Sequence, residues 1–325
     1  MRILMFGRGV IATIYGQALS EAGHDVEFYV RPGRAAEYER EIRTEIFDAR
    51  RVPWGRRTRT TFAPRLRETI GPDDGFDLVV LSVGHHRLAE AASFLAPRVG
   101  EATVLVFGNI WDEPTAAVAP LRADRLLFGF PQAGGGFADD GVLHGSLFRS
   151  VILGTDGELS DARRHDVRAA FQRAGMGVRE EDDMRGWLWL HVAMDAGMFS
   201  QALKSGGLAN MIGDRRALRD AFLATRELAP VLELRGVDLG RHRVATMPYR
   251  HPRATAALLA WATVLIPMAR GNLAAHTDPH TPEHRAVLAD TLRTARELGI
   301  VTPRIERSVR QAPAASSMIP ADGAS

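Results

Sequence analysis

The sequence predicts an α/β protein in which a doubly wound parallel sheet is followed by an all-helical C-terminal domain. Residues 2–30 follow a pattern of strand, glycine turn, helix and strand. Short apolar runs then alternate with helical patterns, and strand patterns stop at about residue 182. Strands that alternate with helices are typical of parallel sheets. The length of 325 residues agrees with two domains, because one hydrophobic core stops growing at roughly 250–300 residues.

Short apolar runs predict the strands of the sheet. After residues 2–6 and a helical pattern through Leu19, the predicted elements are strands over 26–30, 78–82, 103–107 and 125–130 and a helix over 88–96. Residues 42–63 are less regular and predict a short hairpin or an additional strand. Residues 142–144 and 149–153 follow three glycines and predict a hairpin that closes the sheet.

Helical patterns dominate the second half. They cover residues 184–204, 215–235, 253–270 and 283–298. We therefore predict a sheet domain over residues 1–180 and a helical domain over 181–310, used for substrate binding and dimerisation. Residues 311–325 are rich in small residues and proline and predict a disordered tail. The uncharged stretch 254–269 contains Pro267 and is too short to span a bilayer, so we expect a buried helix.

The composition excludes several kinds of chemistry. The chain has no cysteine, which excludes disulfides, zinc–thiolate sites, iron–sulfur clusters and a thiol nucleophile. Lys204 is the only lysine among 41 basic residues, and arginine does not exchange a proton near neutral pH. The arginine excess explains a pI near 9.4 at a net charge of +2 and does not indicate nucleic acid. We expect a cytoplasmic protein that acts on a small molecule, without a nucleic-acid or membrane partner.

A glycine-rich turn after the first strand predicts a dinucleotide site. Its residues are Gly7, Arg8, Gly9, Val10, Ile11 and Ala12, a GxGxxA sequence between a strand and a helix. Gly7 permits the tight turn, Gly9 allows the backbone to approach a pyrophosphate, and Ala12 allows close packing of helix on strand. The helix N-terminus offers free N–H groups to the phosphates. A structural turn in a sheet protein that binds no nucleotide is the alternative interpretation.

The end of the second strand predicts which dinucleotide binds. NAD enzymes commonly carry Asp or Glu there, which binds the ribose 2′-hydroxyl. This chain has Arg31 and Arg34 instead, and guanidinium groups suit a 2′-phosphate. We therefore predict NADP(H) as the cofactor, with Arg31 as the stronger candidate. In a chain so rich in arginine, two in one loop can also lack any special role.

Several segments together resemble the ketopantoate reductase family. They are the GxGxxA turn with EAGHDV and VRPG after it, the strand segment DLVVLS at 77–82, VLVFGN ending at Asn109, GVLHG at 141–145, and Glu283 sixteen residues before Gly299. The resemblance implies a Rossmann-type NADP-binding domain, a helical domain, an active site between them and a reductase activity. It also places Ser82, Val83, Gly84 and Asn109 at the cofactor, and Asn109 and Glu283 at the substrate.

The chain departs from the family at both lysines. The family's catalytic lysine lies in a W-x-K-x-x-x-N pattern, which here matches Trp189, His191 and Asp195. A second lysine, common after the fourth strand, is replaced by Gly84. Lys204 lies thirteen residues beyond His191 on the same predicted helix, about 20 Å away, and cannot take over the role.

His191 is our candidate proton donor, with Asp195 as its orienting partner. The two residues are one helical turn apart, and a carboxylate favours a protonated imidazole. A histidine buried in the core and paired with a helix aspartate is the alternative. His276, His280 and His284 invite a metal interpretation, but Pro279 and Pro282 interrupt a regular helix, and we predict no metal.

The predicted function is NADP(H)-dependent reduction of a ketone or 2-oxo acid to an alcohol. We expect a substrate other than ketopantoate, because both family lysines are missing. One alternative is non-redox acid–base chemistry by His191 and Asp195, such as isomerisation, dehydration or cyclisation. Another is a non-catalytic NADP-binding sensor.

Overall fold

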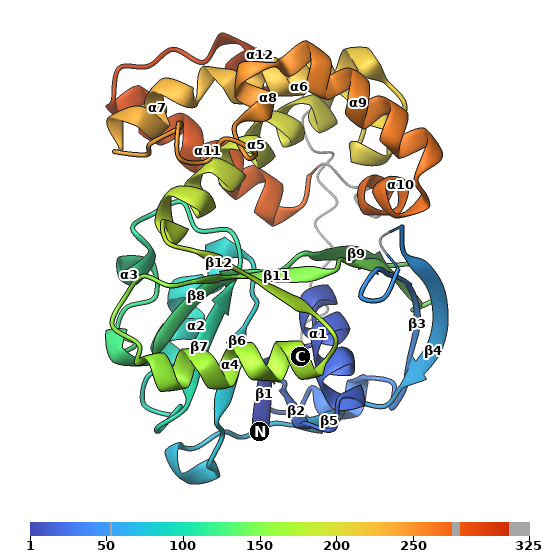
Figure 1. Ribbon diagram of the computed structural model, residues 1–325, viewed down its shortest axis with the longest axis vertical. Coiled ribbons are helices and arrows are strands. Elements are labelled where there is room, and N and C mark those ends of the chain that lie inside the picture. The colour runs from blue at the N-terminus through green and yellow to red at the C-terminus, as the bar shows by residue number, and fades with distance from the viewer. Residues whose placement is uncertain (53, 275–279, 312–325) are drawn as a thin grey trace, which may run out of the picture.

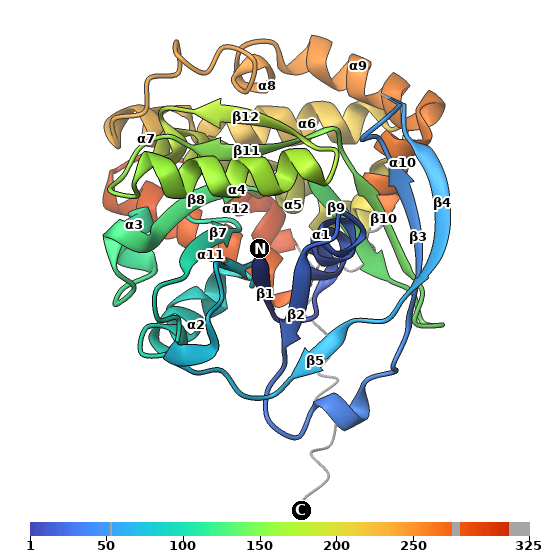
Figure 2. The same ribbon diagram turned by 60° about the horizontal axis from the view of Figure 1, so that its bottom comes forward.

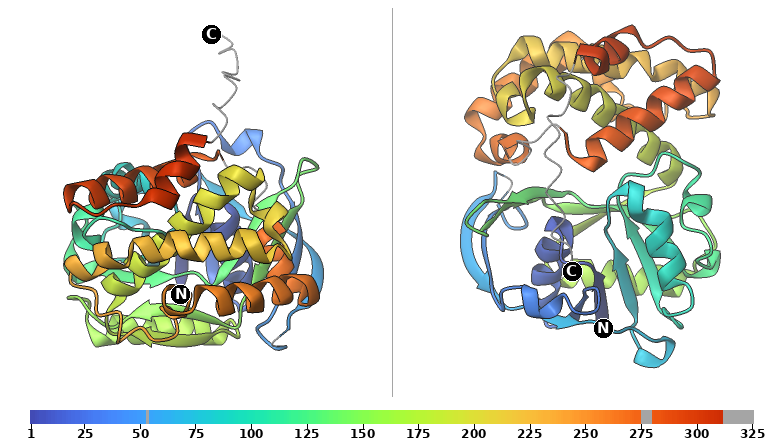
Figure 3. Two further views of the ribbon diagram at one scale, coloured as in Figure 1. Left: turned by 90° about the horizontal axis from the view of Figure 1, so that it is seen from above. Right: turned by 180° about the vertical axis from the view of Figure 1, so that it is seen from behind.

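A computed structural model describes residues 1–52, 54–274 and 280–311 of the chain. The N-terminal part forms a sheet domain, and the C-terminal helices form a second layer against it (Figure 1). Views from above and from behind show the same arrangement (Figure 3). The α/β fold class predicted from the sequence is confirmed.

The main sheet has eight strands in the order β12-β11-β8-β7-β6-β1-β2-β5. All neighbouring pairs are parallel except β8 with β11. The strands are β1 (Arg2–Phe6), β2 (Asp25–Tyr29), β5 (Arg65–Arg67), β6 (Leu78–Leu81), β7 (Thr103–Phe107), β8 (Leu126–Phe130), β11 (Ser150–Gly154) and β12 (Gly177–Glu181). The chain builds outward from β1 in one direction and then from β6 in the other. The switch point for ligand binding therefore lies between β1 and β6.

Helices cover both faces of this sheet. α1 (Val10–Glu21) and α4 (Asp161–Arg173) pack on one face, and α2 (Leu88–Leu95) and the start of α5 pack on the other. The close approach of α1 to the sheet depends on Gly16, where an added Cβ would lie 2.3 Å from Cζ of Phe28. α4 and β12 were not predicted, because α4 is mostly polar and β12 is short and charged. A short helix, α3 (Pro114–Ala117), follows β7.

A second, four-stranded sheet lies beside the first, with β4 at its outer edge (Figure 2). Its strands are β3 (Ile42–Asp48), β4 (Arg56–Phe62), β9 (Ala133–Phe137) and β10 (Leu143–Leu147). β3 and β4 form the predicted hairpin. The predicted pairing of residues 142–144 with 149–153 is wrong, because β10 pairs with β9 and β11 joins the main sheet. Glycines decide this: a Cβ at Gly135 would lie 2.3 Å from the carbonyl oxygen of His144.

The helical domain is built around α5 (Met184–Ser205), which packs on α6, α11 and α12. The other helices are α6 (Arg215–Glu227), α7 (Ala229–Leu234), α8 (Met247–Arg250), α9 (Pro252–Leu265), α10 (Pro267–Ala274), α11 (Pro282–Glu297) and α12 (Pro303–Gln311). The predicted helix over 253–270 is broken at Ile266, because Pro267 lacks the N–H that would continue it. Similarly, the predicted helix over 215–235 divides at Leu228.

The expectation that residues 254–269 are buried is wrong. Leu258, Trp261 and Leu265 of α9 are 61%, 57% and 57% exposed. Among the described helices none alone is long and apolar enough to cross a membrane, and α9 with α10 reaches that composition only across a 99° bend. The sheet ends at Glu181 and α5 begins at Met184, close to the boundary predicted at residue 180. The predicted disordered tail lies outside the described residues beyond Gln311.

Candidate active site between the two domains

The candidate site lies where neighbouring strands of the main sheet end. Gly7 follows β1, Ser82 follows β6, and Asn109 comes two residues after β7. These three strands are neighbours and parallel, so their carboxyl ends lie along one edge. From the helical domain, α5 and α11 supply Asp195 and Glu283 to the same place.

The glycine turn fits a dinucleotide. Gly7 has a φ of +102°, which favours glycine, and Gly9 precedes the first turn of α1. An added Cβ at either glycine would meet nothing within 4 Å, so the space over both backbones is open. No side chain caps α1, which leaves its first N–H groups available for a phosphate. Ala12 is buried against the sheet, as its predicted packing role requires.

The side chain of Arg8 makes two contacts that its place in the glycine turn does not predict. Its guanidinium carbon lies 4.5 Å from the ring centroid of Tyr38, and Nη2 donates to the carbonyl oxygen of Glu39 at 3.4 Å. Burial lowers the pKa of Arg8, and Tyr38 and Glu39 oppose this shift. The Tyr38 contact was not predicted, because an aromatic residue in a polar loop carries no recognisable signal.

The two arginines after β2 differ in their surroundings. Arg34 is paired with Glu37 at 2.9 Å, whereas Arg31 forms no ion pair with any residue that the structure describes. The turn that carries them is held by Glu68, whose carboxylate accepts a hydrogen bond from the backbone N–H of Ala35 at 2.7 Å. Backbone N–H groups of Ala35 and Gly33 lower the pKa of Glu68. Arg31 is therefore the better placed of the two for an incoming phosphate.

The four predicted catalytic residues are brought together from three parts of the chain. Asn109 Nδ2 donates to Asp195 Oδ2 at 3.0 Å and to Glu283 Oε1 at 3.3 Å. His191 Nε2 lies 3.7 Å from Asp195 Oδ1, on the same face of α5. Two carboxylates thus converge on one amide group, with an imidazole beside them.

His191 is held by aromatic rings. Its ring stacks on Trp187 at 5.3 Å and 10°, and its centroid lies 4.1 Å from that of Phe130. Burial lowers the pKa of His191 from 6.5 to about 4. The expectation that Asp195 keeps His191 protonated is not supported by the geometry, because the 3.7 Å between His191 Nε2 and Asp195 Oδ1 is too long for a hydrogen bond. The imidazole is neutral at pH 7.

The segment after β6 contributes two histidines. A Cβ at Gly84 would lie 2.9 Å from Cε1 of His86 and 3.8 Å from Oε2 of Glu283, so the ring of His86 takes the space that a side chain at Gly84 needs. His85 turns to the helical domain, where its Nε2 lies 3.0 Å from Oδ2 of Asp290 on α11. This pair joins the two domains beside the site. No sequence pattern predicts this contact between His85 and Asp290.

The remaining candidates lie outside the site or outside the described residues. Lys204 is in the last turn of α5, which continues unbroken from His191. His284 is buried against Phe199 at a centroid distance of 3.8 Å. Of the predicted histidine cluster, His276 lies outside the described residues. Within the described part of the chain, no group of three metal-ligating residues is found.

Comparisons with known proteins agree with this architecture. Residues 3–155 match the family model for ketopantoate reductase PanE/ApbA. No curated protein matches the sequence. Among solved structures, D-mandelate dehydrogenase with NADH and anilino(oxo)acetate is 15% identical, with a TM-score of 0.68 and coverage of 95% of this chain and 96% of its own.

Two further structures are similar over nearly their whole length. The 2-dehydropantoate 2-reductase of Geobacter metallireducens is 16% identical, with a TM-score of 0.68 and coverage of 96% of this chain and 100% of its own. The dimeric ketopantoate reductase of Staphylococcus aureus is 14% identical, with a TM-score of 0.60 and coverage of 95% and 96%. At these identities the similarity shows the fold.

The fold and the glycine turn define a Rossmann-type domain with a helical second domain. Residues 3–155 of the sheet domain match the ketopantoate reductase family model, and the resemblance seen in the sequence is confirmed.

Proposed function

We propose that the protein is an NADP(H)-dependent reductase that converts a ketone or 2-oxo acid to an alcohol. The observation that carries the proposal is the convergence of Asn109, Asp195 and Glu283 at the carboxyl edge of the sheet that begins with the open glycine turn. Ketopantoate itself is not expected as the substrate, because neither family lysine is present and Lys204 is at the far end of α5.

Each residue has a proposed role. The N–H groups at the start of α1 bind the pyrophosphate, and Arg31 binds the 2′-phosphate. When bound, the reduced nicotinamide would supply the hydride, and the proton that completes the alcohol would come from solvent. Asn109, Asp195 and Glu283 position the substrate. His191, which is neutral, offers one N–H as a hydrogen-bond donor to the substrate, and the stacking on Trp187 orients its ring.

To test the proposal, the protein is mixed with NADPH and a panel of carbonyl compounds. The absorbance of reduced nicotinamide is then followed over time. Consumption of NADPH with one of them supports the proposal. Tight NADPH binding without turnover of any compound favours the sensor alternative, and no binding at all removes the nucleotide assignment.

A substitution at His191 tests its role. His191→Ala should remove most of the turnover while NADPH affinity, measured by calorimetry, stays unchanged. Full activity of the variant would return His191 to a purely structural role among Trp187 and Phe130. The non-redox alternative is favoured if a substrate is converted without any change in NADPH.

We further propose a homodimer formed through the helical domain. Support comes from α9, where Leu258, Trp261 and Leu265 share one exposed face. The similar protein of Staphylococcus aureus is described as dimeric. Light scattering should give twice the chain mass, and Trp261→Glu should give a monomer; an unchanged mass would exclude this face. A cytoplasmic location remains a prediction of the sequence.

A further inference from the structure

We propose that His86 passes the proton from solvent to the substrate oxygen when the carbonyl group is reduced. The inference rests on the proposed reductase function and adds a catalytic residue to the same site. Three features of the described residues support it: the state of the other nitrogen groups, the position of the His86 ring, and the exposure of that ring to water.

The other nitrogen groups that could donate this proton are neutral, remote or already engaged. Burial lowers the pKa of His191 to about 4, so its imidazole is neutral at pH 7. Lys204 lies in the last turn of α5, at the far end of an unbroken helix. His85 is bound through Nε2 to Asp290 at 3.0 Å, and its Nδ1 is buried without a hydrogen-bond partner among the described residues. Arginine does not give up its proton near neutral pH.

The ring of His86 lies against the backbone of Gly84, directly after β6. A Cβ added at Gly84 would lie 2.9 Å from Cε1 and 3.2 Å from Nδ1 of His86, and 3.8 Å from Oε2 of Glu283. The imidazole and the carboxylate therefore lie beside the same point, although they come from different domains. Glu283 also accepts a hydrogen bond from Asn109 at 3.3 Å. His86 thus lies beside the residues proposed to position the substrate.

His86 differs from His191 in its contact with water. His86 is exposed, whereas His191 is enclosed by Trp187 and Phe130. The neighbouring ring of His85 approaches it edge-on, at a centroid distance of 6.2 Å. An exposed imidazole exchanges protons with solvent, and histidine is the side chain that ordinarily changes its charge near neutral pH. His86 can therefore be reprotonated after each turnover.

The surroundings of His86 favour its protonated form. The charged and titratable side chains that border this segment, from its own residues and from α2 and α11, are His85, Arg87, Glu90, Glu283 and Asp290. Asp290 is paired with His85, so Glu283 is the carboxylate that lies beside the His86 ring. A neighbouring carboxylate favours a protonated imidazole.

The reaction balances with His86 as the acid. When a hydride adds to the carbonyl carbon, the π electron pair of the C=O bond moves to oxygen, and this oxygen takes the proton of the imidazolium. The products are the alcohol, the oxidised nicotinamide and a neutral imidazole, which regains a proton from solvent. His191 then needs to donate only a hydrogen bond, as its neutral state allows.

Proton uptake on ligand binding tests His86 without turnover. Phenylglyoxylate, a 2-oxo acid, is titrated by calorimetry into the protein saturated with NADP⁺, in two buffers of different ionisation enthalpy. Above neutral pH the bound anion should draw a proton onto His86, which makes the heat depend on the buffer. His86→Gln should abolish this uptake, whereas His165→Gln, at an exposed position of α4, should retain it. Unchanged uptake in His86→Gln would overturn the inference.

Turnover provides the second test, with NADPH and the carbonyl compound that the panel identifies. His86→Gln should lower kcat by about a hundredfold and leave NADPH affinity unchanged. In the unsubstituted protein kcat should fall as the pH rises, because the protonated imidazole is the active form. His86→Lys should retain much of the activity and move this decline to higher pH, since lysine keeps its proton to higher pH than histidine. A purely structural role would not produce that shift.

Gly84→Ala tests the position of the ring. The backbone φ of −57° at Gly84 suits alanine, and the added Cβ would press on the ring of His86. The variant should lower kcat by about tenfold, and it should have no further effect in a protein that already carries His86→Gln. An equal loss in both backgrounds would show that the His86 ring has no role there.

The results separate this inference from the proposed function. Equal consumption of NADPH by the protein and by His86→Gln keeps the reductase and removes His86 as its acid. No consumption of NADPH with any carbonyl compound removes the reductase, and the inference with it. Melting curves of each variant show whether a loss of activity reflects a loss of folding.

Discussion

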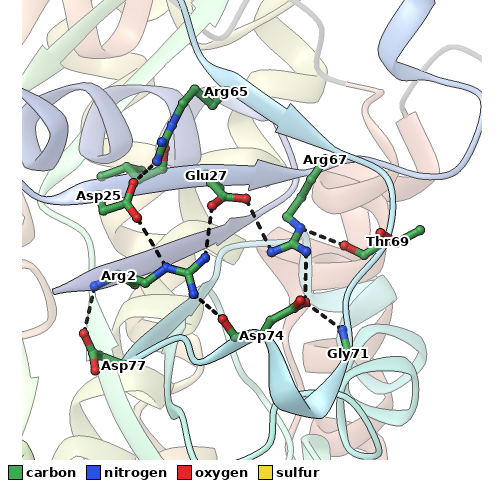
Figure 4. A network of polar contacts seen from close by, with 10 residues as sticks. Arg2, Asp25, Glu27, Arg65, Arg67, Thr69, Gly71, Asp74 and Asp77 are labelled. Atoms are coloured by element: carbon green, nitrogen blue, oxygen red, sulfur yellow. Dashed lines mark hydrogen bonds and ion pairs between the residues drawn. The ribbon is translucent and has the colours of Figure 1, made fainter.

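The two edges of the main sheet differ in how their charged side chains are arranged. At the edge where the parallel strands begin, every arginine of a dense network faces carboxylates or carbonyl oxygens (Figure 4). At the edge where they end, two carboxylates share a single amide nitrogen, that of Asn109. Both edges are built from the same strands, so the difference lies in the side chains that the sequence places at each end.

The first edge is a network of matched pairs. Arg2 lies 3.3 Å from Asp25 and 3.4 Å from Glu27, and Arg67 lies 3.4 Å from Glu27 and 3.0 Å from Asp74. A hydrogen bond from Arg65 is the main cause of the lowered pKa of Asp25. Charges that are paired in this way support the fold, although each exposed pair contributes little.

At the second edge, two carboxylates converge on one amide group. Converging carboxylates cost stability and are common at functional sites. We therefore expect changes at the first edge to affect stability alone and changes at the second to affect ligand binding. Four predictions test this separation, from the largest effect to the smallest.

Gly9→Val should abolish nucleotide binding without harm to the fold. The backbone at Gly9 has a φ of −73°, which valine tolerates, and a Cβ there meets no atom within 4 Å. The side chain then occupies the path of the pyrophosphate, and NADPH affinity should fall by about a hundredfold or more. Calorimetry and a melting curve measure both properties.

Gly16→Val is the matched control on the same helix. Its side chain would collide with Phe28, so it should lower the melting temperature strongly. If Gly9→Val binds NADPH normally, the glycine turn is structural.

The decrease of the free energy of unfolding at acid pH should depend on His191. Because its pKa is about 4 in the folded protein and 6.5 ordinarily, the unfolded chain takes up a proton first. The free energy of unfolding is therefore complete above pH 6.5 and falls as the pH drops towards 4, by roughly 2–3 kcal/mol for this group. Urea titrations of the protein and of His191→Phe at several pH values should differ by this amount; identical pH dependence would refute the neutral state.

Arg31→Ala should weaken NADPH by about tenfold and leave NADH nearly unchanged, because a phosphate loses one charge-assisted hydrogen-bond partner. Arg34→Ala, which removes a residue already paired with Glu37, should have a smaller effect. Equal losses for both nucleotides would defeat the assignment of the 2′-phosphate to Arg31.

Arg67→Gln should cost about 1 kcal/mol of unfolding free energy and leave nucleotide affinity unchanged. Its side chain is 19% exposed, and its guanidinium contacts Glu27, Asp74 and the carbonyl oxygen of Thr69. Arg122→Gln, in an exposed pair with Asp124, should lower the stability less than Arg67→Gln does. A loss of NADPH affinity in Arg67→Gln would show that the two edges are coupled.

The sequence predicted the parts of the fold that have strong local patterns. The strands around Gly7, the helix from Val10 and the long helix α5 lie where apolar periodicity and glycine placed them. β5 was missed, since three residues carry no periodicity. α9 was expected to be buried because it is apolar, and only the packing of the helical domain leaves its outer face exposed.

By itself, the sequence determined the glycine-rich turn, the resemblance to the ketopantoate reductase family and the absence of a lysine that could act near His191. These follow from residue identity and from spacing along single elements, which are local properties. Only the tertiary structure decided that Asn109, Asp195 and Glu283 meet, since they are up to 174 residues apart. It also decided that the pKa of His191 is lowered, because the burial of the ring depends on how Trp187 and Phe130 pack against it.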